Sequence, residues 1–375
     1  MLALFVFAKI ATPAYAMFNV SAAQLDAMAF HAPLGQLPRH CSGQWCVQVE
    51  DSHCMLANTL HYESFEVRWA AAYAEQWFLN HGSGTFVDIG ANCGLFSMIM
   101  AALRHDVMAF EPLPTCVSDI ELGRKQSGFG AGSTFAVQQR GISDRNATFP
   151  VPANLCSPYF QVGQAKYRAK GKLHDLDTHS GVSEASSLAL DEAVARRHRQ
   201  KPIFLTKMDT EGHEVPVIRS GTRLFKRHTI KTMMWELSPS KWRFANVSKE
   251  EGLQVLADVI DGSGYVSAVY VDDRKGYPPA CRRDHRLCKT SDSLPTWVTQ
   301  QLNAADEHMK ALEGKGKNRA KWGILPLGVA AFANATFEAV AAGLDSPDLG
   351  RNVLSIAPPR AELPNANLAH RGYER

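Results

Sequence analysis

The stretch TFVDIGANCG, residues 85–94, decides the fold of this chain. Five residues of strand-forming type, Thr85 to Ile89, run directly into a glycine-rich turn that holds Gly90 and Gly94. The apolar run LFSMIMAAL, residues 95–103, follows and is typical of a helix. A buried strand, a glycine-rich turn and a helix form the first unit of many parallel α/β sheets. In such a unit the turn lets a nucleotide approach the backbone closely.

The alternation of strand and helix patterns continues from about residue 61 to about residue 271. Further strands are predicted near residues 105–110, 135–137, 203–208, 230–235 and 265–271, and further helices near 61–78, 115–127, 188–199, 215–225 and 250–262. This order predicts βαβ units with right-handed crossovers. The predicted fold class is therefore α/β, a doubly wound and mostly parallel sheet with helices on both faces. Ligands of such sheets bind beyond the carboxyl ends of the strands.

Four segments are predicted along the chain. Residues 1–16 contain a short apolar run that ends in Ala14-Tyr15-Ala16, a pattern typical of a secretory signal peptide. No basic residue precedes the run, so a buried or unstructured N-terminal segment is the alternative. Residues 17–60 form a cysteine-bearing extension, residues 61–300 the α/β domain, and residues 301–375 a helical or loosely ordered tail.

Charge and hydropathy restrict the partners. The 375 residues carry a formal net charge of only +3, so the composition gives no reason to expect nucleic acid as a partner. The apolar run at the N-terminus is shorter than the roughly 20 residues that cross a bilayer, so no transmembrane span is predicted. A small-molecule or glycan partner fits this composition.

The cysteines favour an oxidising compartment. Their number, eight, is even; Cys41, Cys46 and Cys54 lie close together, as do Cys281 and Cys288. Short spacings of this kind are typical of local disulfides, and without a CxxC pair no metal site is predicted. Asn-x-Ser/Thr triplets, each an acceptor pattern for glycosylation, begin at Asn19, Asn146, Asn246 and Asn334. The prediction is a glycoprotein of the secretory pathway or the cell exterior, with a cytoplasmic location as the alternative.

The glycine-rich turn distinguishes between two kinds of nucleotide. A dinucleotide site has the pattern G-x-G-x-x-G and receives a pyrophosphate at the helix N-terminus, but Asn92 stands at the second glycine position. Asp88, two residues before the turn, would repel a pyrophosphate and suits a ligand with a cationic amino-acid part. Glu111 ends the next strand, where an acid accepts hydrogen bonds from ribose hydroxyls. The alternatives are an ordinary βα connection and a solvated glutamate at a helix start.

Charged residues also end the fourth and fifth predicted strands. Lys207 and Asp209 share one face of a strand because side chains alternate, and a central parallel strand is normally apolar on both faces. This pair therefore predicts an ion pair beside the cleft, with a purely structural salt bridge as the alternative. The carboxylates and the histidine expected to gather on the same rim are Asp209, Glu211, Glu236 and His213.

Five short motifs in this order resemble the FkbM-type family of S-adenosylmethionine-dependent methyltransferases. They are Val87–Gly94, Phe110-Glu111-Pro112, Ile142-Ser143-Asp144, Ser187–Asp191 and Lys207–Glu214. The resemblance covers about residues 85–240, with residue 271 as its furthest limit, and implies a Rossmann-like class I methyltransferase sheet of seven strands. Three segments depart from the family pattern, so the acceptor stays open. They are the extension at 17–60, the polar and irregular insert at 145–187, in which short hairpin pieces are predicted at 147–151 and 158–162, and the tail after residue 300.

The resemblance implies S-adenosylmethionine as the cofactor and O-methylation as the reaction, often of sugars or secondary metabolites. The predicted substrate is accordingly a hydroxyl-bearing small molecule or a glycan. The residues implied at the cofactor are Asp88, Gly90, Asn92, Gly94, Glu111, Ser143 and Asp144. The residues implied beside the transferred methyl group are Asp209, Glu211 and His213.

The roles at the rim have alternatives. A hydroxyl acceptor loses a proton, for which His213 is placed first and Asp209 second. Asp209 can instead position the cofactor, and His213 can simply cap the next helix. Two further classes of protein share the fold: a scaffold that binds the cofactor without catalysis, and a nicotinamide-dependent dehydrogenase, which the missing G-x-G-x-x-G disfavours.

Overall fold

The computed structural model describes residues 39–42, 45–48, 64–126, 135–154, 156, 166–169, 172–175, 181–195, 201–272, 278–289, 298, 300, 302, 320–345 and 351–359. The predicted signal peptide lies outside the described residues. Of the extension at 17–60, the structure describes a two-stranded antiparallel hairpin, β1 (Arg39–Ser42) and β2 (Trp45–Gln48). No helix in the described ranges combines the length and apolar character that a membrane span requires.

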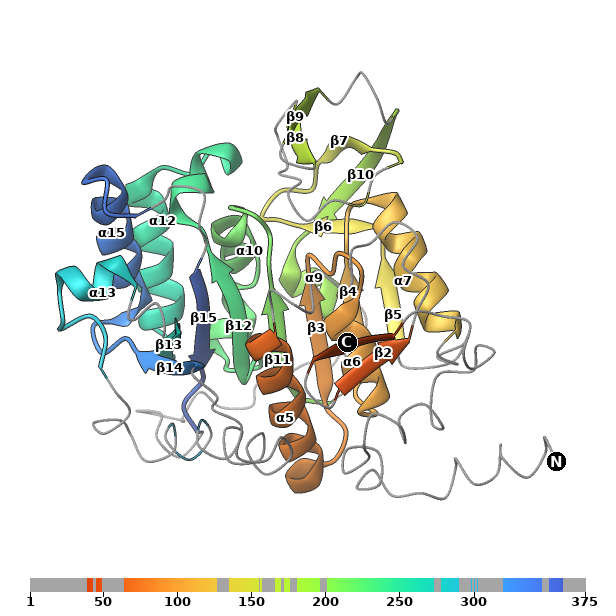
Figure 1. Cartoon of the computed structure of the whole chain (residues 1–375), viewed down its shortest axis with the longest axis horizontal. Helices are drawn as coiled ribbons and strands as arrows, with labels where there is room; N and C mark the ends of the chain where they lie inside the picture. The colour runs from red at the N-terminus through yellow and green to blue at the C-terminus, as the bar shows by residue number, and fades with distance from the viewer. Residues whose placement is uncertain are drawn as a thin grey trace, which may run out of the picture.

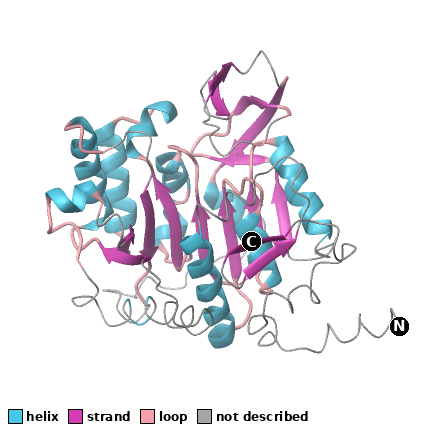
Figure 2. Cartoon of the chain, in the orientation of Figure 1, coloured by secondary structure: helices cyan, strands magenta, loops and turns pink. Residues whose placement is uncertain are grey.

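One eight-stranded sheet forms the centre of the molecule (Figures 1 and 2), with the order β14-β13-β15-β12-β11-β3-β4-β5. Its strands are β3 (Thr85–Ile89), β4 (Asp106–Phe110), β5 (Phe135–Gln138), β11 (Ile203–Met208), β12 (Thr232–Leu237), β13 (Val266–Asp272), β14 (Ala320–Ile324) and β15 (Arg351–Ile356). The strands from β5 to β12 are parallel. Within this sheet the first strand along the chain is β3. The next two, β4 and β5, lie on one side of β3, and the chain then continues on the other side of β3 with β11. The winding direction therefore reverses between β3 and β11, which is where ligands of doubly wound sheets bind.

The predicted fold class is confirmed, and the number of strands is corrected from seven to eight. β15 lies antiparallel between β12 and β13, and β14 extends the sheet beside β13. Both strands come from the region predicted as a helical or loosely ordered tail, so the sheet draws on residues beyond the predicted domain end at 300. The pairing of β15 with β12, from Thr232 and Ile356 to Leu237 and Arg351, joins segments far apart in the sequence.

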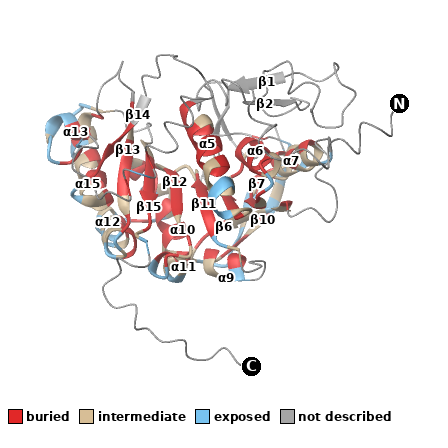
Figure 3. Ribbon diagram, turned by 90° about the horizontal axis from the view of Figure 1, so that it is seen from below, coloured by how far each residue is buried: buried red, intermediate tan, exposed pale blue. Residues whose placement is uncertain are grey.

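Helices cover both faces of the sheet (Figure 3). One face carries α5 (Ser64–His81), α6 (Leu95–Ala102) and α7 (Pro114–Gln126). The other carries α9 (Leu190–Ala195), α10 (Glu214–Ser220), α11 (Thr222–Lys226), α12 (Lys249–Val255), the π-helical η2 (Leu256–Asp261) and α15 (Gly328–Ala341). Neighbouring strand residues supply opposite cores: Phe86 packs among α5 and α6, whereas Val87 packs among the second group. This is the alternation expected of a strand buried on both faces.

The insert predicted to be irregular holds a second, smaller sheet. Its strands are β6 (Arg140–Ile142), β7 (Thr148–Pro152) and β10 (Val182–Leu188), in the order β6-β10-β7, and a hairpin of β8 (Lys166–Ala169) and β9 (Lys172–Asp175) follows β7 in the chain. The helix predicted from residue 188 starts only at Leu190, because the chain up to Leu188 is strand. The serine-rich segment of β10 has few apolar side chains, which explains why its pattern predicted no strand. Figure 1 shows this sheet at the top, beyond the end of the main sheet where the parallel strands finish.

Candidate functional site

A pocket lies at the carboxyl ends of β3, β4 and β11, where the winding direction of the sheet reverses. Its floor is formed by the residues that follow these three strands, and β6 forms one wall. The residues predicted from the sequence that line it are Gly90, Asn92, Glu111, Asp209, Glu211 and His213. Residues from separate motifs thus meet in one pocket, as expected for the carboxyl edge of a parallel sheet.

The glycine-rich turn after β3 fits tightly against the end of β11. Gly90 has a φ of +74°, and a Cβ atom there would lie 1.9 Å from the carbonyl oxygen of Asp209. The amides of Gly90 and Ala91 both donate to the carbonyl oxygen of Phe110, at 2.9 and 3.1 Å. Only glycine allows this approach. The turn therefore fixes the ends of β3, β4 and β11 relative to one another.

Glu111 links two loops of the pocket. Its Oε2 accepts a hydrogen bond of 2.8 Å from the Asn92 amide, and its Oε1 accepts one of 2.9 Å from the Leu113 amide. Burial raises the pKa of Glu111 to about 7, although both backbone hydrogen bonds act against that rise. Each carboxylate oxygen keeps a second lone pair, so the side chain can still accept hydrogen bonds from two hydroxyls of a ligand.

Asp88 lies behind the turn and does not line the pocket. It is 1% exposed, and its Oδ2 accepts a hydrogen bond of 2.6 Å from the Ser97 hydroxyl on α6. Burial raises the pKa of Asp88, while the nearby ammonium group of Lys207 opposes the rise. Gly94, also predicted at the cofactor, is the N-cap of α6 with a φ of +76°, and a Cβ atom there would lie 2.9 Å from the side chain of Ile120 on α7. Both residues therefore shape the turn from its far side.

Ser143 and Asp144 line a second pocket that adjoins the first. The two pockets share Gly141, Ile142 and His213 as a common wall. The Ser143 hydroxyl lies 3.1 Å from His213 Nε2, and Asp144 accepts a hydrogen bond of 2.6 Å from Arg219. Burial lowers the pKa of His213 to about 4, so its imidazole is neutral at neutral pH.

The predicted ion pair at the end of β11 is confirmed. Lys207 Nζ lies 3.3 Å from Asp209 Oδ2 and donates to the carbonyl oxygen of Gly90 at 3.0 Å. The second carboxylate oxygen, Asp209 Oδ1, is buried and has no hydrogen-bond partner within the described part of the chain. A buried acceptor without a partner is costly, and a cationic group of a ligand would satisfy it.

Three carboxylates gather on this rim, as the sequence predicted. One oxygen each of Asp209, Glu211 and Glu236 lies within 4.8 Å of the others. Burial is the largest cause of the raised pKa values of Glu211, about 7, and Glu236, about 8, and the carboxylate of Asp209 adds to both. Such a group can hold a cation, but two lysines already supply positive charge to it, so the prediction of no metal is retained.

Lys241 is the site residue that the sequence did not reveal. It lies on the 3-10 helix η1 (Pro239–Ala245), with Nζ 2.6 Å from Glu211 and 3.8 Å from Glu236. Burial lowers the pKa of Lys241, but the two carboxylates outweigh burial and raise it above its usual value. Nothing in the local pattern marks this lysine, because only the fold of η1 over the end of β12 brings it to the rim.

The buried glutamates predict a stability that falls as the pH rises. The pKa is raised from about 4.5 to about 7 in four of them and to about 8 in the fifth, so between these values the folded state binds more protons than the unfolded state. These residues are Glu66, Glu111, Glu211, Glu214 and Glu236. We expect the free energy of unfolding in urea to fall by about 2 kcal/mol from pH 7 to 8.5. A flat or rising profile would contradict the raised values, and Glu111→Gln should make the fall shallower.

The fold and the pocket define the class of protein as a doubly wound, Rossmann-like α/β protein with an acidic pocket at the carboxyl edge of its sheet. The family model described as methyltransferase FkbM domain matches residues 88–266. These residues therefore form a methyltransferase domain of the FkbM family, which confirms the family that the five motifs predicted. The cofactor implied by this family is S-adenosylmethionine.

Several solved structures of methyltransferases are similar to this chain at low identity. Precorrin-6y C5,15-methyltransferase from Geobacter metallireducens GS-15 is 12% identical, with 55% of this chain and 76% of that chain covered and a TM-score of 0.28. The plantazolicin methyltransferase BamL, in complex with a triazolic desmethylPZN analog and SAH, is 10% identical, with 80% and 88% covered and a TM-score of 0.33. A SAM-dependent methyltransferase from Agrobacterium tumefaciens is 10% identical, with 46% and 44% covered and a TM-score of 0.25. No curated protein matches the chain. The assignment therefore depends on the family match over residues 88–266.

Proposed function

We propose that this protein transfers a methyl group from S-adenosylmethionine to a hydroxyl group of a carbohydrate or a secondary metabolite. The observation that carries the proposal is the acidic pocket within the FkbM domain, in which Glu111 and Asp209 present buried carboxylate oxygens on opposite sides of the Gly90 turn. Such a pocket suits a ligand that has both ribose hydroxyls and a cationic amino-acid part.

The pocket offers a partner for each part of this cofactor. Glu111 would accept hydrogen bonds from the ribose hydroxyls, because its position is fixed by two backbone amides. Asp209 would pair its free Oδ1 with the ammonium group, and Asn92 would line the ribose side. We place adenine against Gly141 and Ile142. The residues assigned a supporting role, behind or beside these contacts, are Asp88, Gly90, Gly94, Ser143 and Asp144.

Bound S-adenosylmethionine supplies a methyl group on a positively charged sulfur, which is already an activated leaving group. The protein's own task is to align the acceptor oxygen and to accept the proton of its hydroxyl group. A pKa of about 4 makes His213 a weak base at neutral pH, whereas the pKa of Glu211, about 7, is near the optimum for a general base. We therefore place Glu211 ahead of His213 as the proton acceptor. His213 would then orient the acceptor from the wall that the two pockets share.

Binding and transfer measurements test this proposal together. S-adenosylhomocysteine should bind in calorimetry and NAD should not. A screen of sugars and hydroxylated metabolites with a methyl-labelled donor should identify an acceptor. Glu211→Gln should then lower transfer at least tenfold while the affinity for S-adenosylhomocysteine stays within a fewfold of wild type. Binding without transfer to any acceptor would favour a scaffold instead of an enzyme, and binding of NAD would overturn the assigned pocket.

A location in the secretory pathway or outside the cell follows from the cysteines, and we propose it on that ground. Disulfides join Cys116 to Cys156 and Cys281 to Cys288, and no cysteine in the described residues is free. Disulfides of this kind persist in oxidising compartments. Mass spectrometry of the mature protein should find cleavage after Ala16, intact disulfides and glycans. Retention of Met1 together with free thiols would contradict the proposal and favour the cytoplasm.

A further inference from the structure

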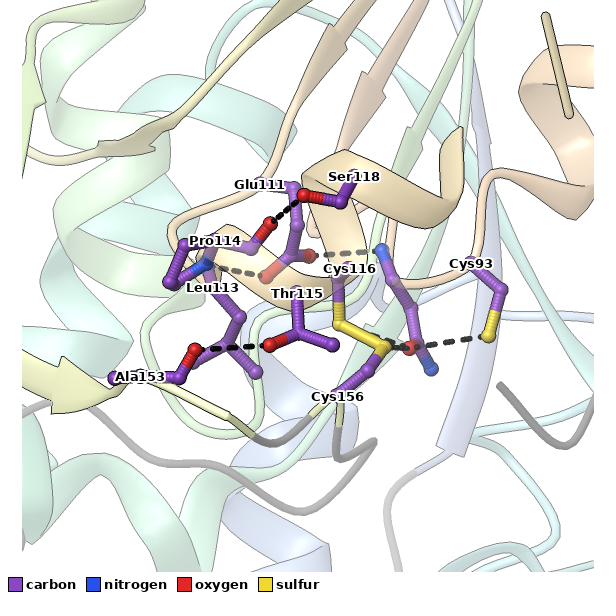
Figure 4. The surroundings of a disulfide bond; sticks show 10 residues. Cys93, Glu111, Leu113, Pro114, Thr115, Cys116, Ser118, Ala153 and Cys156 are labelled. Carbon is purple, nitrogen blue, oxygen red and sulfur yellow. Dashed lines mark hydrogen bonds between the residues drawn. A yellow bond between two sulfur atoms is a disulfide. The ribbon is translucent and has the colours of Figure 1, made fainter. Parts of the chain in front are cut away.

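A disulfide lies directly against the glycine-rich turn of residues 90–94, which we call the cofactor loop (Figure 4). Cys116 belongs to the first turn of α7, Cys156 follows β7 of the insert, and their Cα atoms lie 4.8 Å apart. Both residues are buried. The sulfur of Cys156 lies 3.2 Å and that of Cys116 3.6 Å from Asn92 Oδ1. The disulfide therefore packs against the side chain of a residue that lines the pocket.

Asn92 joins this disulfide to Glu111. Its φ of +50° is left-handed, a conformation that asparagine tolerates better than other residues with a side chain. In this conformation its side chain reaches the two sulfur atoms while its amide donates to Glu111. The packing of the two sulfur atoms against its side chain therefore restrains the same residue whose amide donates to Glu111.

The disulfide also fixes the second backbone amide that donates a hydrogen bond to Glu111. That amide belongs to Leu113, directly before α7, and α7 is tied to the insert in its first turn. Besides the disulfide, the Thr115 hydroxyl donates to the carbonyl oxygen of Ala153 at 3.0 Å. Figure 4 shows this hydrogen bond from Thr115 to Ala153, with Cys116 and Cys156 on the other side of Thr115. Both hydrogen bonds to Glu111 thus come from backbone that this cross-link holds.

A second disulfide bond flanks the same loop. Cys93 follows Asn92, is disulfide-bonded, and has its sulfur 3.5 Å from Asn92 Oδ1.

The Cys116–Cys156 disulfide closes a long loop, because the two cysteines are 40 residues apart. A cross-link restricts the chain most when it closes a long loop. The disulfide therefore ties the insert that departs from the family pattern to α7, beside the cofactor loop.

We propose that the Cys116–Cys156 disulfide positions the cofactor loop, by holding Asn92 and Leu113 in the places from which their amides fix Glu111. Cys116 and Cys156 are positioning residues in this arrangement, since neither lines the pocket. The inference rests on the proposed function, because Glu111 is the proposed partner of the ribose. It assigns the insert a role in cofactor affinity in addition to any role in acceptor choice.

Calorimetric titration with S-adenosylhomocysteine tests the inference. The double variant Cys116→Ala with Cys156→Ala should bind about tenfold more weakly than wild type, the size expected when a hydrogen bond to a charged group is lost. The matched control is Cys281→Ala with Cys288→Ala, which removes a disulfide of similar burial that lines neither pocket. The control should bind within twofold of wild type. Equal weakening in both double variants would overturn the inference.

Asn92→Gly supplies the second test, with every disulfide intact. Glycine keeps the left-handed backbone and removes only the side chain that contacts the sulfur atoms. We expect about tenfold weaker binding. Adding Cys116→Ala and Cys156→Ala should weaken it further by less than those two changes do in wild type, because the contact between Asn92 and the disulfide is already gone and only the hold on Leu113 is left to lose. Additive losses would overturn the inference, since a purely structural disulfide gives additivity. If the wild-type protein does not bind S-adenosylhomocysteine, the proposed function fails. If the wild-type protein binds it and the variants bind it with the same affinity, only the positioning role of the disulfide fails.

Discussion

Replacing Glu111 with alanine is expected to weaken binding of S-adenosylhomocysteine by about a hundredfold. Two hydrogen bonds to a charged group are each worth about 1.5–3 kcal/mol, and about 1.4 kcal/mol corresponds to a factor of ten. The variant also leaves the buried amides of Asn92 and Leu113 without the acceptor they now share. Calorimetry at pH 8 measures the effect with Glu111 largely ionised, because its pKa is raised only to about 7.

Asp144→Ala is the matched control for this prediction. Asp144 lies in the adjoining pocket, where it pairs with Arg219, so its removal should change the affinity by less than fivefold. The affinity of Glu111→Gln should lie between those of Glu111→Ala and Asp144→Ala. The NH₂ group of the glutamine would face one of the two backbone amides that now donate a hydrogen bond to Glu111. Wild-type affinity in Glu111→Ala would remove the central contact from the proposed site.

Local pattern was enough to predict the strands that carry the site. The bounds of β3 and β11 were predicted to the residue, because each is a short apolar run that stops at a glycine or a charged residue. The Lys207–Asp209 ion pair followed from alternation along one strand, and the meeting of Glu111 with Asp209 in one pocket followed from the parallel sheet. These features depend on contacts that the sequence pattern encodes within a few residues.

Features that depend on distant pairing were not predictable. β15 lies inside the sheet because it pairs with β12, more than a hundred residues earlier in the chain, and with β13. β10 is stabilised by strands on both sides and not by its own serine-rich pattern. Lys241 reaches Glu211, and the Cys116–Cys156 disulfide reaches Asn92, through elements whose placement is set by tertiary packing. With eight cysteines, 105 full pairings are possible, so the sequence did not identify this one.

Gly90→Ala is expected to abolish binding of S-adenosylhomocysteine and to destabilise the protein by about 3–5 kcal/mol. The new methyl group would lie 1.9 Å from the carbonyl oxygen and 3.0 Å from the carbonyl carbon of Asp209. Both are backbone atoms, so the clash is relieved only if the end of β11 separates from the turn. That movement would break the bond from the Asp209 amide to Ile89 and shift Asp209 out of the pocket.

Gly82→Ala isolates this clash from backbone strain. Gly82 has nearly the same left-handed φ, +76° against +74°, but no described atom beyond its chain neighbours lies within 4 Å of the place that a Cβ atom would take there. Its substitution should therefore cost only the strain of about 1–2 kcal/mol and leave binding intact. Urea unfolding and calorimetry of the two variants give the comparison. Similar losses of stability and affinity in both variants would mean that the left-handed turn, and not its approach to β11, determines the pocket. A much larger loss in Gly90→Ala would establish that contact between the ends of β3 and β11 holds the cofactor site together.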